Sequence, residues 1–199
     1  MQVSILTTYL TAIAGLGNPE ERHERTLHNA GFWFVDELAR RAGEEFRYEK
    51  RFDADVCRIS LSGKGIWLVK PQSYMNLSGG PVRSVLDYYR LAVSDLLVAH
   101  DEIDLPPGTV RLKKGGGHGG HNGLRDLIKH TGSDFMRLRI GVGHPGHKDL
   151  VTDYVLKRAS AEVEQAMLRN VDDAADVMPV LVEDGIEAAM TRLHTKDDS

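Results

Sequence analysis

The chain has 199 residues and a mass of 22.1 kDa, enough for one domain with a substantial core and short for two. Hydrophobic residues make up 41% and charged residues 27%, ordinary globular values that exclude a disordered or fibrous chain. The formal net charge of −4 argues weakly against a nucleic-acid partner for the chain as a whole. No apolar run reaches the ~18 residues of a membrane-spanning helix, so no membrane partner is expected.

The N-terminal residues resemble a secretory signal only in part. Residues 1–14 are fairly apolar, but no Lys or Arg occurs before Arg22, and a signal peptide needs a positive region ahead of its apolar core. We therefore expect residues 1–8 to be an extension that leads into a strand of a cytoplasmic protein. The one cysteine, Cys57, cannot form an internal disulfide, and its strand-like surroundings predict a buried thiol in a reducing compartment.

Strand-like and helix-like segments alternate along the rest of the chain. Apolar runs and alternating patterns predict strands at residues 8–15, 52–61, 66–69, 96–99, 110–112 and 138–142. Helical spacing predicts a helix that Asn29 caps and Gly43 ends, helices over residues 78–89 and 122–129, and a last helix from Ala161 that Pro179 should kink or break. This alternation predicts an α/β fold with one domain over residues 1–199. Its three-layer sandwich has a mixed, mostly parallel, twisted sheet with helices on both faces.

Glycines and polar residues gather in four predicted loops. Their sequences are GLGNP (15–19), SYMNLSG (73–79), AHDEIDLPPG (99–108) and GGGHGGHNG (115–123). Three of them closely follow a predicted strand, and ligands of open α/β sheets bind beyond the carboxyl ends of the strands. The sequence therefore predicts that the loops meet in one crevice. GGGHGGHNG matches neither a Walker A loop nor a dinucleotide fingerprint, so it indicates only a backbone that a ligand can approach closely.

Charge is spread unevenly along the chain. Residues 106–148 hold eight basic and two acidic residues, a net charge of +6, whereas residues 1–105 carry −3 and residues 149–199 carry −7. Five of the nine histidines fall in the basic segment. Such a segment is typical of a phosphate-binding face on an otherwise acidic protein. A solvated surface whose charges average out in three dimensions would have the same composition.

Histidines and carboxylates leave more than one kind of site open. His118 and His121, with His28 and Asp101, are candidates for a zinc set, although HxxH on a glycine loop lacks the rigid spacing of a helical metal motif. An acyl-enzyme is disfavoured, because Cys57 lies in a strand and no GxSxG elbow occurs. His28 at a helix entry would instead act on water, with Asp101 at a strand end holding its imidazole in one tautomer. A helix-cap histidine and a turn-forming aspartate are the purely structural alternative.

Four long segments carry a resemblance to a known family. They are GLGNPEERHERTLHNAGFWFVDELA, KPQSYMNLSGGPV, LLVAHDEIDLPPGTVRLKKGGGHGGHNGLRDLI and FMRLRIGVGHPG. In this order they closely resemble bacterial peptidyl-tRNA hydrolase, from Ala12 to about Leu193. The resemblance implies hydrolysis of the ester between a peptide and the terminal ribose of tRNA, which recycles tRNA after aborted translation. It also implies a cytoplasmic monomer without metal or other cofactor, whose partner is the acceptor stem and 3′ end of peptidyl-tRNA.

The resemblance also implies roles for single residues. His28 resembles the catalytic histidine and Asp101 its supporting carboxylate. Asn18 resembles the asparagine that distinguishes blocked from free aminoacyl-tRNA, and the amide of Asn76 is our candidate donor to the developing oxyanion. Residues that resemble those holding the peptide or the tRNA are His23, Tyr74, Met75, Asn76, Asn122, His121, Arg111, Lys113, Lys114 and Arg139.

Three residues depart from the family pattern. Glu20 stands where a glycine usually follows the proline, His23 replaces a tyrosine that contacts the substrate, and Leu27 replaces the arginine before the His-Asn pair. These departures put contacts near the tRNA 3′ end in doubt more than the chemistry. Two alternatives stay open: a non-catalytic RNA-binding factor of the same fold, and a metal-dependent esterase that uses His118 and His121.

Overall fold

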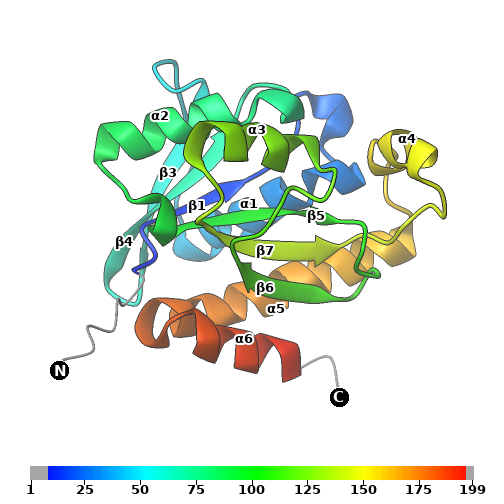
Figure 1. The fold of residues 1–199 in the computed structure, drawn as a ribbon. Coiled ribbons are helices and arrows are strands. Elements are labelled where there is room, and N and C mark those ends of the chain that lie inside the picture. The colour runs from blue at the N-terminus through cyan, green and yellow to red at the C-terminus, as the bar shows by residue number, and fades with distance from the viewer. Residues whose placement is uncertain (1–8, 196–199) are drawn as a thin grey trace.

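One mixed sheet organises residues 9–195, the part of the chain that the computed structural model describes; the expected extension over residues 1–8 lies outside it. Its seven strands are β1 (Ala12–Gly15), β2 (Arg47–Glu49), β3 (Ala54–Leu61), β4 (Lys64–Pro71), β5 (Leu96–Glu102), β6 (Val110–Lys114) and β7 (Met136–Gly141). They are ordered β2-β3-β4-β1-β5-β7-β6 (Figure 1). Neighbours from β4 to β7 are parallel, while β3 and β6 run antiparallel to their partners. The mixed, mostly parallel sheet predicted from the sequence is therefore confirmed.

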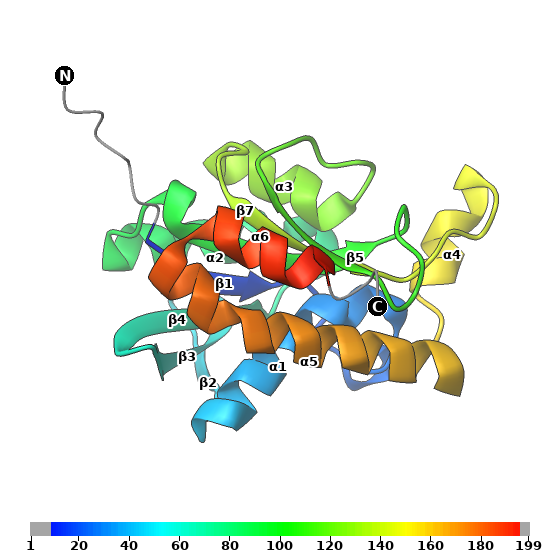
Figure 2. The same ribbon diagram turned by 90° about the horizontal axis from the view of Figure 1, so that it is seen from below.

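Helices cover both faces of the sheet (Figures 1 and 2). One face carries α1 (Ala30–Ala42), α5 (Ala161–Asp184) and α6 (Ile186–His194). The other face carries α2 (Gly79–Tyr89) and α3 (Asn122–Thr131), and the short α4 (Val151–Val155) lies near the carboxyl end of β7. The predicted three-layer sandwich is confirmed. Among the described residues, no helix combines the length and the apolar character needed to cross a membrane.

Each face of the sheet has its own hydrophobic core. In β5, Leu97 packs into the core beneath α1 and α5, whereas Val98 packs into the core beneath α2 and α3. A strand buried on both faces needs apolar residues at successive positions, which explains the unbroken apolar run at residues 96–99. Cys57 lies in the first core, where burial raises the pKa of its thiol, so the predicted buried thiol is confirmed.

Three elements and one helix interior differ from the sequence-based expectation. β2, α4 and α6 are not predicted, since β2 and α4 are too short to show a period and α6 begins directly after Gly185. Of the kink or break predicted at Pro179, the break does not occur, because α5 continues through this residue to Asp184. Proline removes one helical hydrogen bond there, but Met178 and Leu181 on either side are buried in the core, and this packing stabilises the turn.

The glycine-rich loop after β6 takes a different route from the other three loops. Because β6 is antiparallel to β7, this loop starts at the end of the sheet where the parallel strands begin. There the Gly115 N–H donates to the Phe135 carbonyl over 2.9 Å. Arg137, buried beneath the loop, donates to the carbonyls of Gly116 and Gly117. The loop then ends at His121, directly before α3. The loop thereby reaches the carboxyl ends of β1, β4 and β5.

Two glycines let α1 touch the backbone of the central strands. A Cβ on Gly31 would lie 2.3 Å from the carbonyl oxygen of Ala99, and a Cβ on Gly15 would lie 2.3 Å from the carbonyl oxygen of Gly31. Neither position can therefore hold a larger residue without moving backbone. Since His28 precedes Gly31 by three residues and Asp101 follows Ala99 by two, this contact sets how closely those two side chains approach.

Replacing Gly31 by alanine tests this close approach. We expect Gly31→Ala to lower the free energy of unfolding by roughly 1–3 kcal/mol, because backbone must shift to admit the methyl group. Gly80→Ala in α2 is the control, since a Cβ there meets no atom within 4 Å. Thermal and urea unfolding measure both variants. Equal stability of the two would show that α1 does not depend on this contact.

Candidate active site

A cleft of about 830 Å³ opens at the carboxyl edge of the parallel strands. All four predicted loops line it, through Asn18, residues 74–76, residues 100–104 and residues 117–122. The prediction that these loops meet in one crevice is confirmed. The segment after β7 also lines the cleft, from His144 into α4, and this part of the lining was not predicted from the sequence.

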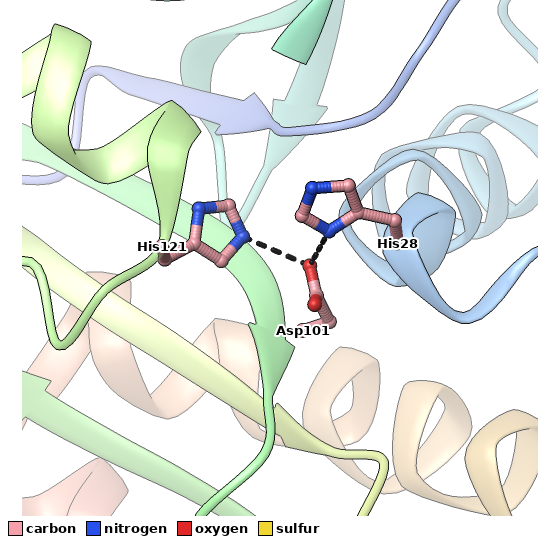
Figure 3. A group of neighbouring side chains, drawn as sticks. All are labelled: His28, Asp101 and His121. Carbon is pink, nitrogen blue, oxygen red and sulfur yellow. Dashed lines mark hydrogen bonds and ion pairs between the residues drawn. The ribbon is translucent and has the colours of Figure 1, made fainter. Parts of the chain in front are cut away.

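His28 and Asp101, which are 73 residues apart in sequence, are in direct contact. His28 lies in the one-turn helix Leu27–Asn29 before α1, and Asp101 is the penultimate residue of β5. Nδ1 of His28 donates to Oδ1 of Asp101 over 2.8 Å. Both residues are buried, with 9% of His28 and 3% of Asp101 exposed. The second ring nitrogen of His28 points away from the carboxylate (Figure 3), and His28 lines the cleft.

His121 is a second imidazole on the same carboxylate oxygen (Figure 3). Its Nε2 lies 2.9 Å from Oδ1 of Asp101. Its Nδ1 accepts the backbone N–H groups of Gly123 at 3.1 Å and Leu124 at 3.3 Å, as the N-cap of α3. A nitrogen that accepts two N–H groups carries no proton, so the hydrogen of His121 is on Nε2 and is donated to Asp101. The sequence indicates His121 as a substrate contact or a zinc ligand and does not predict this bond.

The two imidazoles keep Asp101 ionised. Burial by itself raises the pKa of the Asp101 carboxyl, but the charge interactions and hydrogen bonds of His28 and His121 outweigh it and hold the pKa well below its usual range. Burial likewise lowers the pKa of His28, and the charge and hydrogen bond of Asp101 more than reverse this, so the pKa lies above its ordinary value. An ionised Asp101 holds the Nδ1 proton of His28 and leaves Nε2 with a free lone pair.

A third histidine, His100, supports the backbone of Asp101. Its Nδ1 donates to the Asp101 carbonyl over 2.8 Å, and its ring lies 5.2 Å from that of His121. Burial and the neighbouring His121 lower the pKa of His100 to about 3. His100 therefore stays uncharged at any pH at which the protein works, and it adds no positive charge beside the pair.

The predicted zinc alternative does not fit the hydrogen bonds of the loop. His118 makes no hydrogen bond to Asp101. Its Nδ1 instead accepts the N–H of Gly120 over 3.0 Å. The group that lies together is His28, Asp101 and His121, whose possible ligand atoms are all within 4.8 Å of one another. A metal on Nε2 of His121 would require the proton on Nδ1, where two backbone N–H groups already point. The hydrogen bonds described above account for the cluster without a metal.

Amide side chains line the cleft around His28. Asn18, in the loop after β1, is buried, and its Oδ1 accepts the N–H of Met75 over 2.8 Å. Asn76 lies in the one-turn helix Met75–Leu77, and Asn122 is the first residue of α3. Both are exposed at the cleft, without a hydrogen-bond partner among residues 9–195. Their amides are free to bind a ligand.

Two further predicted contacts lie at the rim. Tyr74 is exposed and donates its hydroxyl to Glu20, one of the residues that depart from the family pattern. His23, another departure, lies in the one-turn helix Glu21–His23 and lines the cleft. Leu27, the third, is buried in the core beneath α1.

Four basic side chains of β6 and β7 share one face of the sheet. Arg111 lies opposite Arg139, and Lys113 lies opposite Arg137. Residues directly opposite in an antiparallel pair point to the same side, where like charges repel. Lys113, Arg137 and Arg139 line the cleft. A polyanion in the cleft would relieve their repulsion.

Two of the other predicted phosphate contacts, Lys114 and Arg111, do not line the cleft. Lys114 follows Lys113 in a strand, so its side chain lies on the opposite face, the side on which Leu112 packs into the core beneath α5. Arg111 shares the face of Lys113 but does not line the cleft. Arg139 is already paired with Glu102 over 3.0 Å. Of the four predicted basic contacts, Lys113 is thus the one that lines the cleft without a carboxylate partner among the described residues.

Comparison with known proteins gives the family. The sequence matches the family model described as Peptidyl-tRNA hydrolase over residues 12–199. The chain belongs to the peptidyl-tRNA hydrolase family. Among curated relatives of that name, one from Halorhodospira halophila is 52% identical over 183 residues, which cover 92% of this chain and 94% of the relative. Another from Stenotrophomonas maltophilia is 48% identical over 187 residues, covering 94% and 97%.

Solved structures agree with this assignment. The peptidyl-tRNA hydrolase of Acinetobacter baumannii superposes with a TM-score of 0.91 at 42% identity, covering 94% of this chain and 95% of that chain. The resemblance recognised in four sequence segments is therefore confirmed. It extends to the whole arrangement of sheet and helices.

The pKa directions predict how hydrolysis depends on pH. A reaction that uses His28 as its base needs the neutral imidazole, so its rate is expected to fall as the pH drops through the pKa of His28, which Asp101 raises above the ordinary 6.5. In Asp101→Asn the raising charge is lost and burial remains, so the acidic limb of kcat/KM should move to lower pH. Its plateau should fall ~10³–10⁴-fold, as when a triad loses its carboxylate. If the acidic limb does not shift in Asp101→Asn, then Asp101 does not influence the pKa of the group that titrates.

Proposed function

We propose that this protein hydrolyses the ester of peptidyl-tRNA, with His28 as the general base that activates water. The observation that carries this proposal is the buried hydrogen bond between His28 and Asp101 beside a cleft lined by amides and cations. The peptidyl-tRNA hydrolase family supplies the substrate class. Free tRNA and a free peptide are the products, which returns tRNA to translation.

The proton transfers follow from the tautomers. Nε2 of His28 takes a proton from water as the water oxygen attacks the ester carbonyl carbon, and the imidazolium that forms is stabilised by Asp101. When the tetrahedral intermediate collapses, the bond to the ribose oxygen breaks and His28 returns the proton to that oxygen. A positioned base contributes ~10²–10⁴-fold to such a step.

The developing negative charge needs a hydrogen-bond donor. Asn76 is the candidate, because it lines the cleft in the middle of a one-turn helix whose first residue, Met75, is buried and held by Asn18. Loss of one such donor costs ~10²–10³ in rate. The Asn76 amide has no hydrogen-bond partner among the described residues. An oxyanion could therefore accept its N–H without breaking an existing bond.

We also propose the setting in which the enzyme works. The buried thiol of Cys57 suits the reducing cytoplasm. The whole chain is proposed to act as one domain and as a monomer. No metal or other cofactor is proposed, since the groups named above supply a base, an oxyanion donor and cations at the carboxyl ends of the strands of one sheet.

Removing the base gives the first test of this function. We expect His28→Ala to lower kcat on an N-acetylated aminoacyl-tRNA by at least ~10²-fold, because water is no longer deprotonated. The Kd for uncharged tRNA should stay within about twofold, since the cationic residues are untouched. Undiminished hydrolysis in this variant would remove His28 from the role.

Adjacent lysines on β6 test where tRNA binds. Lys113→Gln should weaken tRNA binding and reduce the slope of log K against log salt by roughly one, since one phosphate contact is lost. Lys114→Gln is the matched control, because it removes the same charge from the opposite face of the same strand. Filter binding at several salt concentrations measures both. If the two variants behave alike, the tRNA lies elsewhere.

A further inference from the structure

We propose that His194, the last residue of α6, positions the strand β6 for tRNA binding through a hydrogen bond to the outer edge of that strand. The inference rests on the proposed binding of tRNA at Lys113. It goes beyond that proposal because it gives α6 a role in substrate binding, although α6 lies outside the cleft and outside the four segments that carry the family resemblance.

A hydrogen bond from backbone to ring connects β6 with α6. Nε2 of His194 accepts the backbone N–H of Leu112 over 3.1 Å, across 82 residues of sequence. A ring nitrogen that accepts an N–H carries no proton, so neutral His194 carries its hydrogen on Nδ1. Burial and the nearby charge of Arg111 lower the pKa of His194, which favours the neutral ring and keeps Nε2 able to accept.

This bond pairs a backbone group on the outer edge of the sheet. β6 ends the strand order, with β7 on one side and no strand on the other among the described residues. In an antiparallel pair, every second residue exchanges hydrogen bonds with the partner strand, and the residues between them point outward. Leu112, between Arg111 and Lys113, points its N–H outward to His194. His194 therefore holds β6 on the side that no strand supports, where an edge N–H otherwise faces water.

The cleft face of the same strand carries a repulsion that the bond opposes. Lys113 lies directly opposite Arg137, and both line the cleft. Like charges in this position repel and favour a twist of β6 that separates the two side chains. Such a twist would turn the Leu112 N–H away from His194, and a hydrogen bond contributes free energy of the same order as the repulsion. The bond therefore keeps Lys113 at its place in the cleft wall.

Apolar packing fixes the His194 ring relative to the sheet. α6 lies beside β6 (Figure 1), and Leu193 is buried in the same core as Leu112 of β6. The helix thus covers the face of β6 opposite to Lys113, and its last residue reaches the edge of the strand. His194 does not line the cleft, so it acts on a bound tRNA only through the position of β6.

Two substitutions separate the hydrogen bond from the bulk of the ring. His194→Phe keeps an aromatic ring but has no acceptor, whereas His194→Gln has an acceptor oxygen at a similar distance along the side chain. We expect His194→Phe to raise the Kd for uncharged tRNA at least threefold and to reduce the slope of log K against log salt, because Lys113 no longer meets its phosphate. His194→Gln should stay within about twofold of the unaltered protein. Filter binding at several salt concentrations measures both.

The rate at saturation provides a second readout. Since His28 and Asp101 are untouched, kcat on an N-acetylated aminoacyl-tRNA should stay within about twofold in both His194 variants, while KM follows Kd. A kcat that falls as much as KM rises would show a general distortion of the protein and would overturn a positioning role confined to β6.

Combining His194→Phe with Lys113→Gln tests whether His194 acts through Lys113. If it does, His194→Phe should raise Kd by less than about 1.5-fold in the Lys113→Gln background, because the contact that it disturbs is already lost. Effects that multiply in the double variant would show that His194 acts on another contact, and the inference would be wrong.

Thr191→Ala is the control on the same helix. Thr191 is exposed and donates its hydroxyl to the Glu187 carbonyl within α6, so this variant perturbs the helix without touching β6. It should leave Kd and the salt slope unchanged. Equal weakening in Thr191→Ala or in His194→Gln would assign the effect to the stability of α6 and overturn the role of the bond to Leu112.

The outcomes distinguish this inference from the proposed function. If the unaltered protein does not cleave an N-acetylated aminoacyl-tRNA, the proposed hydrolysis is wrong, while the tRNA affinities still decide the inference. If Lys113→Gln leaves tRNA binding unchanged, the proposed position of the tRNA and the inference are both wrong. If Lys113→Gln weakens binding and His194→Phe does not, only the inference is wrong.

Discussion

A single buried carboxylate oxygen connects the parts of the site. Oδ1 of Asp101 accepts one N–H from His28 and one from His121, and the three residues come from β5, the turn before α1 and the end of the glycine-rich loop. An unpaired buried carboxylate costs several kcal/mol. The two imidazoles offset that cost, so the interaction that keeps Asp101 ionised also holds the three segments in register.

Two buried contacts of the cleft depend on the same turn. Leu27–Asn29 presents His28 to Asp101 and, one residue later, Asn29 to the backbone of Asn18. The turn sits where it does because Gly31 allows α1 to meet the carbonyl of Ala99. A backbone contact without any polar side chain therefore determines the geometry of the base.

The layers of the fold and the shared crevice could be predicted from local patterns, because buried strands and helix faces impose a period on the sequence. The bond from His121 to Asp101 could not, since it depends on the path of a glycine loop and on two backbone amides. Asn29 looked like a helix cap because that role is local, whereas its pairing with Asn18 is tertiary. Lys114 is different: strand alternation, visible in the sequence, already separates it from Lys113.

Charge is divided between the two sides of the sheet in a way that suits a polyanion. The cations of β6 and β7 that line the cleft lie on the side of α3. The opposite side is covered by α5 and α6, and α5 carries seven acidic residues and one arginine. Long-range repulsion therefore disfavours approach of RNA from the side of α5 and α6, while attraction favours approach from the cleft side. The negative net charge by itself argued against a nucleic-acid partner, but part of it lies on α5, on the side of the sheet away from the cleft, where it helps to orient the RNA.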